Sequence, residues 1–175
     1  MILVNGIPKS GTHALLKAVE LLGVTAGQIV LDHIPYNTQF LDNIDKHLYI
    51  IRHPRNVLIS YCRWKHQPVT GGMLIGFMHD FMGKTFTTYC QDFIPWLTDQ
   101  NAFVVKYEDL MMNDAVIRSI ADHLNIIYLE DAFPNLPGLT PTWTGNPSDW
   151  TTIWNPEIDA EWQLQCQSVQ EEMGY

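Results

Sequence analysis

Short apolar runs alternate along the chain with segments of helical periodicity. An apolar run at positions 2–4 leads into a glycine-containing loop, and apolar residues then recur at helical spacing from Ala14 until Gly23 ends the pattern. Across the whole chain, such patterns predict strands at residues 2–4, 29–31, 47–52 and 103–107. They predict helices at residues 14–22, 41–46, 55–65, 77–97, 113–125 and 156–173.

This alternation predicts an α/β protein in three layers, with a parallel sheet flanked by helices on both faces. A length of 175 residues suits a single domain over residues 1–175, and 46% hydrophobic residues are enough to form its core. Loops are expected where glycine or proline gathers, at residues 68–76 and at residues 128–156, which hold five of the ten prolines.

The loop after the first strand has the composition of an anion-binding site. Glycines let the backbone close around a ligand, and the following helix presents unpaired N–H groups at its N-terminus. Lys9, Ser10 and Thr12 add an ammonium group and two hydroxyl groups at the same place. The spacing differs from the nucleotide loop G-x-x-x-x-G-K-[ST], because Lys9 precedes Gly11. The sequence therefore predicts a site for a phosphate-like group.

Residues 8–12, which read Pro-Lys-Ser-Gly-Thr, resemble the 5′-phosphosulfate loop of sulfotransferases that use 3′-phosphoadenosine 5′-phosphosulfate (PAPS). In that family the loop typically reads P-K-S-G-T-T-W. The resemblance implies a P-loop-type parallel sheet and PAPS as the sulfuryl donor, with no metal. His13 stands where the family has a second threonine, and Ala14 replaces the tryptophan that stacks on adenine. The donor contacts that the resemblance implies in this loop are Pro8, Lys9, Ser10, Gly11, Thr12 and His13.

A second segment resembles the same family at the site of the donor's 3′-phosphate. Residues 52–61 read R-H-P-R-N-V-L-I-S-Y and are similar to the family's R-D-P-R-D-x-x-x-S-Y. In the family the first arginine and the serine hold the 3′-phosphate, which implies that role for Arg52 and Ser60. An arginine at a strand end offers a fork of donors, and Ser60 lies about one and a half helical turns into the next element.

His33 is the candidate catalytic base. It follows the expected strand 29–31, and the carboxyl edge of an open parallel sheet is where ligands bind. An imidazole there can accept a proton near neutral pH. His-x-Pro at residues 33–35 resembles the H-L-P segment whose histidine is the base in many sulfotransferases. Taken alone, the segment would also suit a histidine in a surface loop.

Two later segments are also similar to the family. Residues 107–110 read Y-E-D-L, and the resemblance places Tyr107 beside the donor's adenine, with a core-packed tyrosine as the alternative. Residues 145–151 are similar to part of R-K-G-x-x-G-D-W-K, which gives Gly145 a place in the donor site. The family's Arg-Lys pair, which also grips the 3′-phosphate, is Trp143-Thr144 in this chain.

The distribution of charge favours an anionic ligand in the N-terminal part. Residues 1–106 hold nine of the ten Lys and Arg against seven acids, while residues 107–175 hold only Arg118 against twelve acids. A net charge of −9 argues against nucleic acid and anionic membranes as partners. The chain shows no signal peptide and no apolar stretch of the ~18 residues that would span a bilayer, so a cytoplasmic protein is expected. The three cysteines lack the spacing of a disulfide framework or a zinc site.

The sequence thus predicts transfer of a sulfuryl group from PAPS to a hydroxyl or amine of a small acceptor. His33 would take the acceptor's proton, Lys9 would stabilise the developing charge, and Ser60 and Arg52 would position the donor. One alternative is a sulfotransferase-like nucleotide-binding module without catalysis. The other is a P-loop kinase, in which Lys and a Mg²⁺-binding Ser or Thr would follow the last glycine. Aromatic residues that could line an acceptor pocket are Tyr36, Phe40, Trp64, Phe77 and Phe81.

Overall fold

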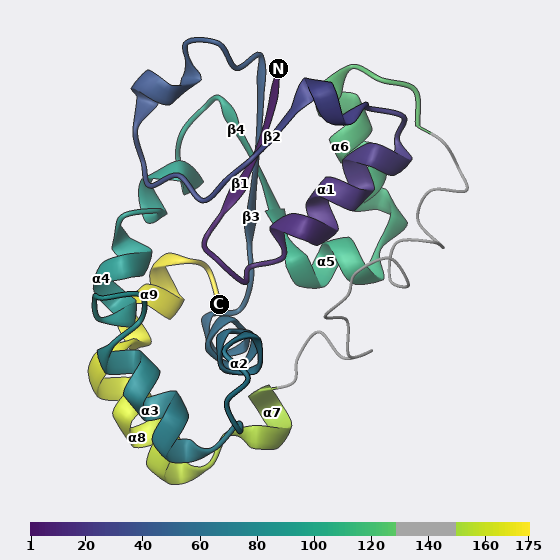
Figure 1. Cartoon of the computed structure of the whole chain (residues 1–175). Helices are drawn as coiled ribbons and strands as arrows, with labels where there is room; N and C mark the ends of the chain where they lie inside the picture. The colour runs from purple at the N-terminus through teal and green to yellow at the C-terminus, as the bar shows by residue number, and fades with distance from the viewer. Residues whose placement is uncertain (129–149) are drawn as a thin grey trace.

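The computed structural model describes residues 1–128 and 150–175, and it contains a four-stranded parallel sheet. The strands lie in the order β2-β1-β3-β4, and helices cover both faces of the sheet (Figure 1). Their bounds are β1 (Ile2–Gly6), β2 (Ile29–Leu31), β3 (Lys46–Ile51) and β4 (Ala102–Lys106). The predicted α/β fold, with a parallel sheet between layers of helices, is confirmed.

The strand order creates a crevice at the carboxyl ends of β1 and β3. β1 pairs with β2 on one side and with β3 on the other, where Gly6 lies opposite Ile50. The chain leaves β1 toward helix α1 (Thr12–Leu21) and leaves β3 toward α2 (Pro54–Trp64), and these helices pack on opposite faces of the sheet. Open α/β sheets bind ligands at such a switch point.

Alternate residues of β3 face the two cores of the molecule, as the geometry of a strand requires. Leu48 and Ile50 belong to the core under α1, whereas Tyr49 and Ile51 belong to the core on the other face. The core that contains Leu48 and Ile50 is covered by α1, α5 (Tyr107–Met112) and α6 (Asp114–Leu124). Figure 1 shows these three helices side by side.

The opposite face carries the larger aromatic core. Trp96, Trp162, Phe81 and Phe86 are fully buried in it. Helices α3 and α8 are far apart in the sequence but run side by side below the sheet (Figure 1). The helices of this group are α2, α3 (Gly71–His79), α4 (Phe86–Gln91), α7 (Trp150–Ile153), α8 (Pro156–Gln165) and α9 (Gln167–Glu172).

Residues 68–97 differ most from the prediction. A loop was expected at residues 68–76, but α3 begins within it because the Thr70 hydroxyl accepts a hydrogen bond from the Met73 N–H at 3.4 Å. The single helix expected at 77–97 is wrong. Met82 and Gly83 have φ angles of 56° and 85°, which an α-helix cannot contain, so the chain turns there. Helix α4 and the 3₁₀ helix η3 (Ile94–Leu97) follow separately.

Smaller corrections concern the ends of elements. The short helix expected at 41–46 is replaced by the 3₁₀ helix η2 (Thr38–Leu41), and another 3₁₀ turn, η1 (Ala26–Gln28), precedes β2. The last helix is interrupted at Cys166, where φ is −132°. Tyr107 begins α5 instead of ending a strand. Residues 129–149 of the predicted loop lie outside the described residues.

The three cysteines lie in the interior. Cys62, Cys90 and Cys166 are free and buried, so each packs as a small apolar side chain. Within residues 1–128 and 150–175, no helix has the length and apolar character needed to cross a membrane.

Candidate functional site

The loop between β1 and α1 depends on two glycines that approach their neighbours closely. A Cβ at Gly6 would lie 2.6 Å from the Ile50 carbonyl oxygen, and a Cβ at Gly11 would lie 2.3 Å from Cδ2 of Tyr107. Gly11, with φ 108°, is the N-cap residue of α1, and Lys9 also has a positive φ of 73°. The N–H groups that an α-helix leaves unpaired at its N-terminus therefore lie at the crevice.

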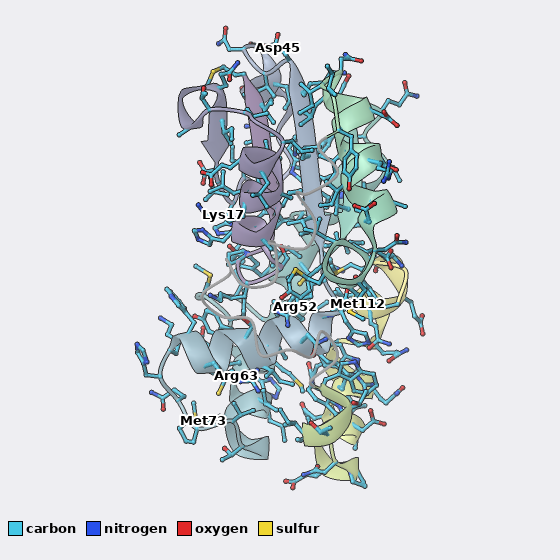
Figure 2. The ribbon with its side chains drawn as sticks, turned by 90° about the vertical axis from the view of Figure 1, so that its right-hand side faces the viewer. Lys17, Asp45, Arg52, Arg63, Met73 and Met112 are labelled. Carbon is cyan, nitrogen blue, oxygen red and sulfur yellow. The ribbon has the colours of Figure 1, made fainter. Side chains whose placement is uncertain are left out.

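A cavity of about 410 Å³ opens at this crevice. Its walls come from the loop and first turn of α1, the segment after β2, the β3–α2 region, the turn after α3 and the start of α5. Figure 2 shows Arg52 between the α1 side of the molecule and α2, with Asp45 at the far end. The residues that line the cavity are Pro8, Lys9, Gly11, Thr12, His13, Ala14, His33, Arg52, Ser60, Trp64, Met82 and Tyr107.

Arg52 connects this loop to the carboxyl end of β3. Its Nη1 donates a long hydrogen bond of 3.5 Å to the Lys9 carbonyl oxygen, and its guanidinium lies over the Tyr107 ring, 4.3 Å from the centroid. Burial, and then the charge of Arg52, lower the pKa of Lys9. A negatively charged ligand between the two side chains would relieve this repulsion. The electrostatics of the cavity therefore favour an anion.

His33 is held at the cavity by the strand beside it. Its backbone N–H donates to Oδ1 of Asp32 at 2.7 Å, and its ring nitrogen Nδ1 lies 2.7 Å from the carbonyl oxygen of Gly6. A carbonyl oxygen only accepts hydrogen bonds, so Nδ1 carries the proton in this contact. Nε2 of neutral His33 is then the nitrogen with a free lone pair, as a general base requires.

Asn5 holds the segment that carries His33, although the sequence did not mark Asn5 as a site residue. Its Oδ1 accepts hydrogen bonds from the N–H groups of Gly6 at 2.8 Å and Ile34 at 2.9 Å, and its Nδ2 donates to the Ile34 carbonyl at 3.1 Å. The side chain is completely buried. A polar residue inside an apolar strand, just before a glycine loop, is the signal that would have found it.

His13 brings a second imidazole to the cavity. Desolvation by its surroundings, followed by the charges of Lys9, His33 and Lys17, lowers the pKa of His13, although much of the residue is exposed. His13 is therefore mostly neutral at pH 7, so it can donate one hydrogen bond to an anion without adding a full charge.

Among the described residues that the sequence predicted for the donor site, all except Ser10 line the cavity. Ser10 is buried, its N–H donates to the Ile7 carbonyl at 3.0 Å, and it is absent from the cavity wall. Gly145, like Trp143-Thr144, lies outside the described residues. Among the described residues, no group of three or more His, Cys, Asp or Glu side chains is arranged to hold a metal ion.

The predicted acceptor aromatics separate into different environments. Trp64 lines the cavity, whereas Phe77 and Phe81 pack in the core below the sheet and Tyr36 packs edge-on against Trp96. The side chain of Phe40 is not described. Met82 also lines the cavity, and no signal in the sequence pointed to it, because only the turn after α3 brings it there.

Arg55 lies in the second motif but not at the cavity. It is buried, and its Nη2 pairs with Oδ1 of Asp159 at 2.8 Å. Its guanidinium also lies over three indole rings, at 4.7, 5.0 and 5.3 Å from their centroids. These rings belong to Trp150, Trp154 and Trp162. Through this ion pair and these ring contacts, Arg55 links α2 to the C-terminal helices.

Glu108 has a similar anchoring contact near the end of β3. Its Oε1 accepts a hydrogen bond from the His53 N–H at 3.0 Å, and its Oε2 accepts one from the Tyr175 hydroxyl at 2.7 Å. Glu108 therefore holds the turn that follows Arg52 and links it to the C-terminal residue.

Comparison with known proteins gives one kind of match. The sequence matches no model of a known protein family and no curated protein. The structure is similar to one titled "Crystal structure of mouse sulfotransferase SULT7A1 complexed with PAP", with a TM-score of 0.74 and 15% sequence identity over 99% of this chain and 83% of that chain. The chain has the sulfotransferase fold. PAP is 3′-phosphoadenosine 5′-phosphate, the product left when PAPS loses its sulfuryl group.

Proposed function

We propose that this chain is a sulfotransferase that moves a sulfuryl group from PAPS to a hydroxyl or amine of a small acceptor. The observation that carries the proposal is that Lys9, His33, Arg52 and Ser60 meet at one cavity beside the N-terminus of α1. They come from connections after three different strands, so only the fold brings them together. The fold shared with a sulfotransferase that was crystallised with PAP supports the same function.

The residues at the cavity suit the two ends of such a donor. The helix N-terminus and the Lys9 ammonium group would hold the 5′-phosphosulfate, and neutral His13 would donate a further hydrogen bond to it. Arg52 and the Ser60 hydroxyl would hold the 3′-phosphate. Ser10 would shape the loop from below, because its side chain is buried. Ala14 also lines the cavity and leaves room where the family has an indole.

The transfer step needs one base and one group that stabilises charge. The acceptor hydroxyl gives its proton to Nε2 of His33 while its oxygen forms a new bond to sulfur. The bond between sulfur and the bridging oxygen breaks, and PAP leaves with the electron pair. Lys9 stabilises the negative charge that develops on the bridging oxygen, and His33 later releases its proton to water.

Trp64 and Met82 mark the side of the cavity where an acceptor would lie. They are 51% and 49% exposed, which is high for large apolar side chains at a cavity. Nζ of Lys9 lies 5.6 Å from the centre of the Trp64 ring, so Trp64 is near the group that would be transferred. An acceptor with an apolar part would cover this surface and gain free energy from its burial.

The test is a calorimetric titration of the protein with PAP, compared with adenosine 5′-phosphate. We expect PAP to bind at micromolar concentration and to bind about tenfold or more tightly than adenosine 5′-phosphate, because charge-assisted hydrogen bonds to the 3′-phosphate are worth about 1.5–3 kcal/mol each. Arg52→Ala should remove the difference. A screen of hydroxyl and amine acceptors for PAP formation from PAPS would then test turnover.

Two other results would replace this proposal. Binding of PAP without turnover for any acceptor in the screen would favour a non-catalytic nucleotide-binding module. Magnesium-dependent transfer of phosphate from ATP would favour a kinase instead. If neither PAP nor adenosine 5′-phosphate binds, the fold remains and the enzyme assignment is wrong.

A further inference from the structure

Tyr107 lies beside Arg52 because of the register between β3 and β4. Ile51 is opposite Lys106 in this parallel pair. Arg52 and Tyr107 directly follow these two residues, so they lie side by side where the two strands end. The Arg52 guanidinium lies over the tyrosine ring, with Cζ 4.3 Å from the centroid. An arginine in this position is attracted by the π electrons of the ring, and more strongly where water is excluded. Arg52 is 8% exposed and Tyr107 is 6% exposed, so the pair is largely dry.

The same ring is held from another direction by the loop before α1. A Cβ at Gly11 would lie 2.3 Å from Cδ2 and 2.9 Å from Cε2 of Tyr107, so the Gly11 backbone packs directly against that side of the ring. Arg52 Nη1 in turn donates to the Lys9 carbonyl, which closes the connection back to the loop. Tyr107 therefore fills the space between the loop and Arg52.

This packing leaves little room for a purine on Tyr107. A base that stacks on an aromatic side chain needs an open face of the ring. Arg52 covers one face of the ring, and Tyr107 is only 6% exposed although it lines the cavity, so little of the ring is open for stacking. The contact with adenine that the sequence resemblance implied for Tyr107 stays a prediction, whereas its contact with Arg52 is observed.

We propose that Tyr107 is a positioning residue, which holds Arg52 against the loop and thereby sets the preference for a nucleotide with a 3′-phosphate. The proposal rests on the proposed function, in which Arg52 binds that phosphate. Its distinctive consequence is that Tyr107 acts on one phosphate of the donor and not on its base.

The first test measures PAP and adenosine 5′-phosphate binding to Tyr107→Leu and Tyr107→Phe by calorimetry. Tyr107→Leu removes the ring, and it should weaken PAP binding by about tenfold while changing adenosine 5′-phosphate binding by less than about threefold. Tyr107→Phe keeps the ring under Arg52 and should retain the preference for PAP. Equal weakening of both nucleotides in Tyr107→Leu would mean that Tyr107 contacts the part they share, and would overturn the proposal.

A second test needs no nucleotide. Phenylglyoxal modifies accessible arginines, and mass spectrometry of peptides gives the rate at each one. Arg52 should react several times faster in Tyr107→Leu than in the unaltered protein or Tyr107→Phe, while buried Arg55 stays protected and shows that the variant is folded. An unchanged rate at Arg52 would overturn the proposal. If Arg55 also reacts, Tyr107→Met, with its longer side chain, replaces Tyr107→Leu in both tests.

The two tests separate the failure of this inference from the failure of the proposed function. If the unaltered protein binds PAP no better than adenosine 5′-phosphate, the donor assignment is wrong. The modification rates then still decide whether Tyr107 holds Arg52. If PAP is preferred but Tyr107→Leu keeps the preference, only the role of Tyr107 is wrong.

Discussion

The Nδ1 atom of His33 lies 2.7 Å from the carbonyl oxygen of Gly6, the last residue of β1. This contact joins the candidate base to the loop that would hold the donor. It also explains why the imidazole presents Nε2, and not Nδ1, as its free nitrogen. A substitution can keep the hydrogen bond to the Gly6 carbonyl while it removes the nitrogen that accepts a proton. Such a substitution separates the positioning role of the side chain from its role as a base.

The substitution His33→Asn tests the base. An asparagine amide nitrogen can replace Nδ1 as the donor to Gly6, but it cannot accept a proton near neutral pH. We expect transfer from PAPS to fall by about 10²–10⁴-fold, with PAP affinity unchanged within about twofold. His33→Ala should lose as much activity. An active His33→Asn protein would show that His33 is not the base.

The close approach of Gly11 to Tyr107 predicts different effects for two glycine substitutions. Gly11 and Gly23 have φ angles of 108° and 89°, so the backbone strain of an alanine should by itself cost about 1 kcal/mol of stability at each position. Only at Gly11 would the new Cβ meet a neighbour, the Tyr107 ring, since nothing lies within 4 Å at Gly23.

Gly11→Ala should therefore weaken PAP binding, while Gly23→Ala should leave it unchanged. Urea unfolding gives the stability of both variants, and calorimetry gives their affinity for PAP. Equal affinities in the two variants would show that the packing of Gly11 on Tyr107 does not matter for the donor site.

Removal of the Arg55 side chain should destabilise the protein. Arg55→Ala loses the pairing with Asp159 and the packing on three indole rings, and we expect a loss of about 3 kcal/mol in the free energy of unfolding. The matched control is Lys84→Ala, because Lys84 pairs with Asp92 at 2.6 Å on the exposed surface. That change should cost less than about 1 kcal/mol. Tryptophan fluorescence in urea measures both, and equal costs would contradict the structural role of Arg55.

His47 predicts a loss of stability in mild acid. It is 1% exposed, and burial lowers its pKa to about 4, with Asp99 opposing the shift and His123 adding to it. Neither ring nitrogen has a hydrogen-bond partner among the described residues. The unfolded chain takes up a proton below about pH 6.5, whereas the folded protein takes it up only near pH 4. Stability contributed by neutral His47 is therefore complete above pH 6.5 and is lost as the pH falls toward 4.

When the pH falls from 7 to 5, the protonation of His47 in the unfolded chain should lower the free energy of unfolding by about 2 kcal/mol. The substitution His47→Gln cannot titrate, so it should make the free energy of unfolding less dependent on pH over this range. His66→Asn, at an exposed position, is the control and should keep the pH dependence of the unaltered protein. The same pH dependence in all three proteins would show that His47 is not responsible.

The failures of sequence-based prediction lie where packing between distant segments decides the local structure. Residues 77–97 have enough apolar positions for one helix, but their side chains pack on α2, α8 and α9, and the chain turns at Met82 and Gly83 to allow this. Periodicity describes one segment at a time, so it cannot show which partner an apolar face will meet. The C-terminal helix was likewise predicted as one element and is interrupted at Cys166.

By itself, the sequence determined the four parallel strands, the helices that follow the first and third of them, and the edge where a ligand would bind. Apolar runs and helical spacing are local properties, and the carboxyl ends of parallel strands must share one edge, so Lys9, His33 and Arg52 were bound to come near one another. Only the tertiary structure decided that Asn5 anchors the His33 segment, that Arg55 turns away into a group of indole rings, and that Tyr107 packs between Gly11 and Arg52. These contacts depend on strand register and on burial between distant segments, and no local pattern of residues encodes either.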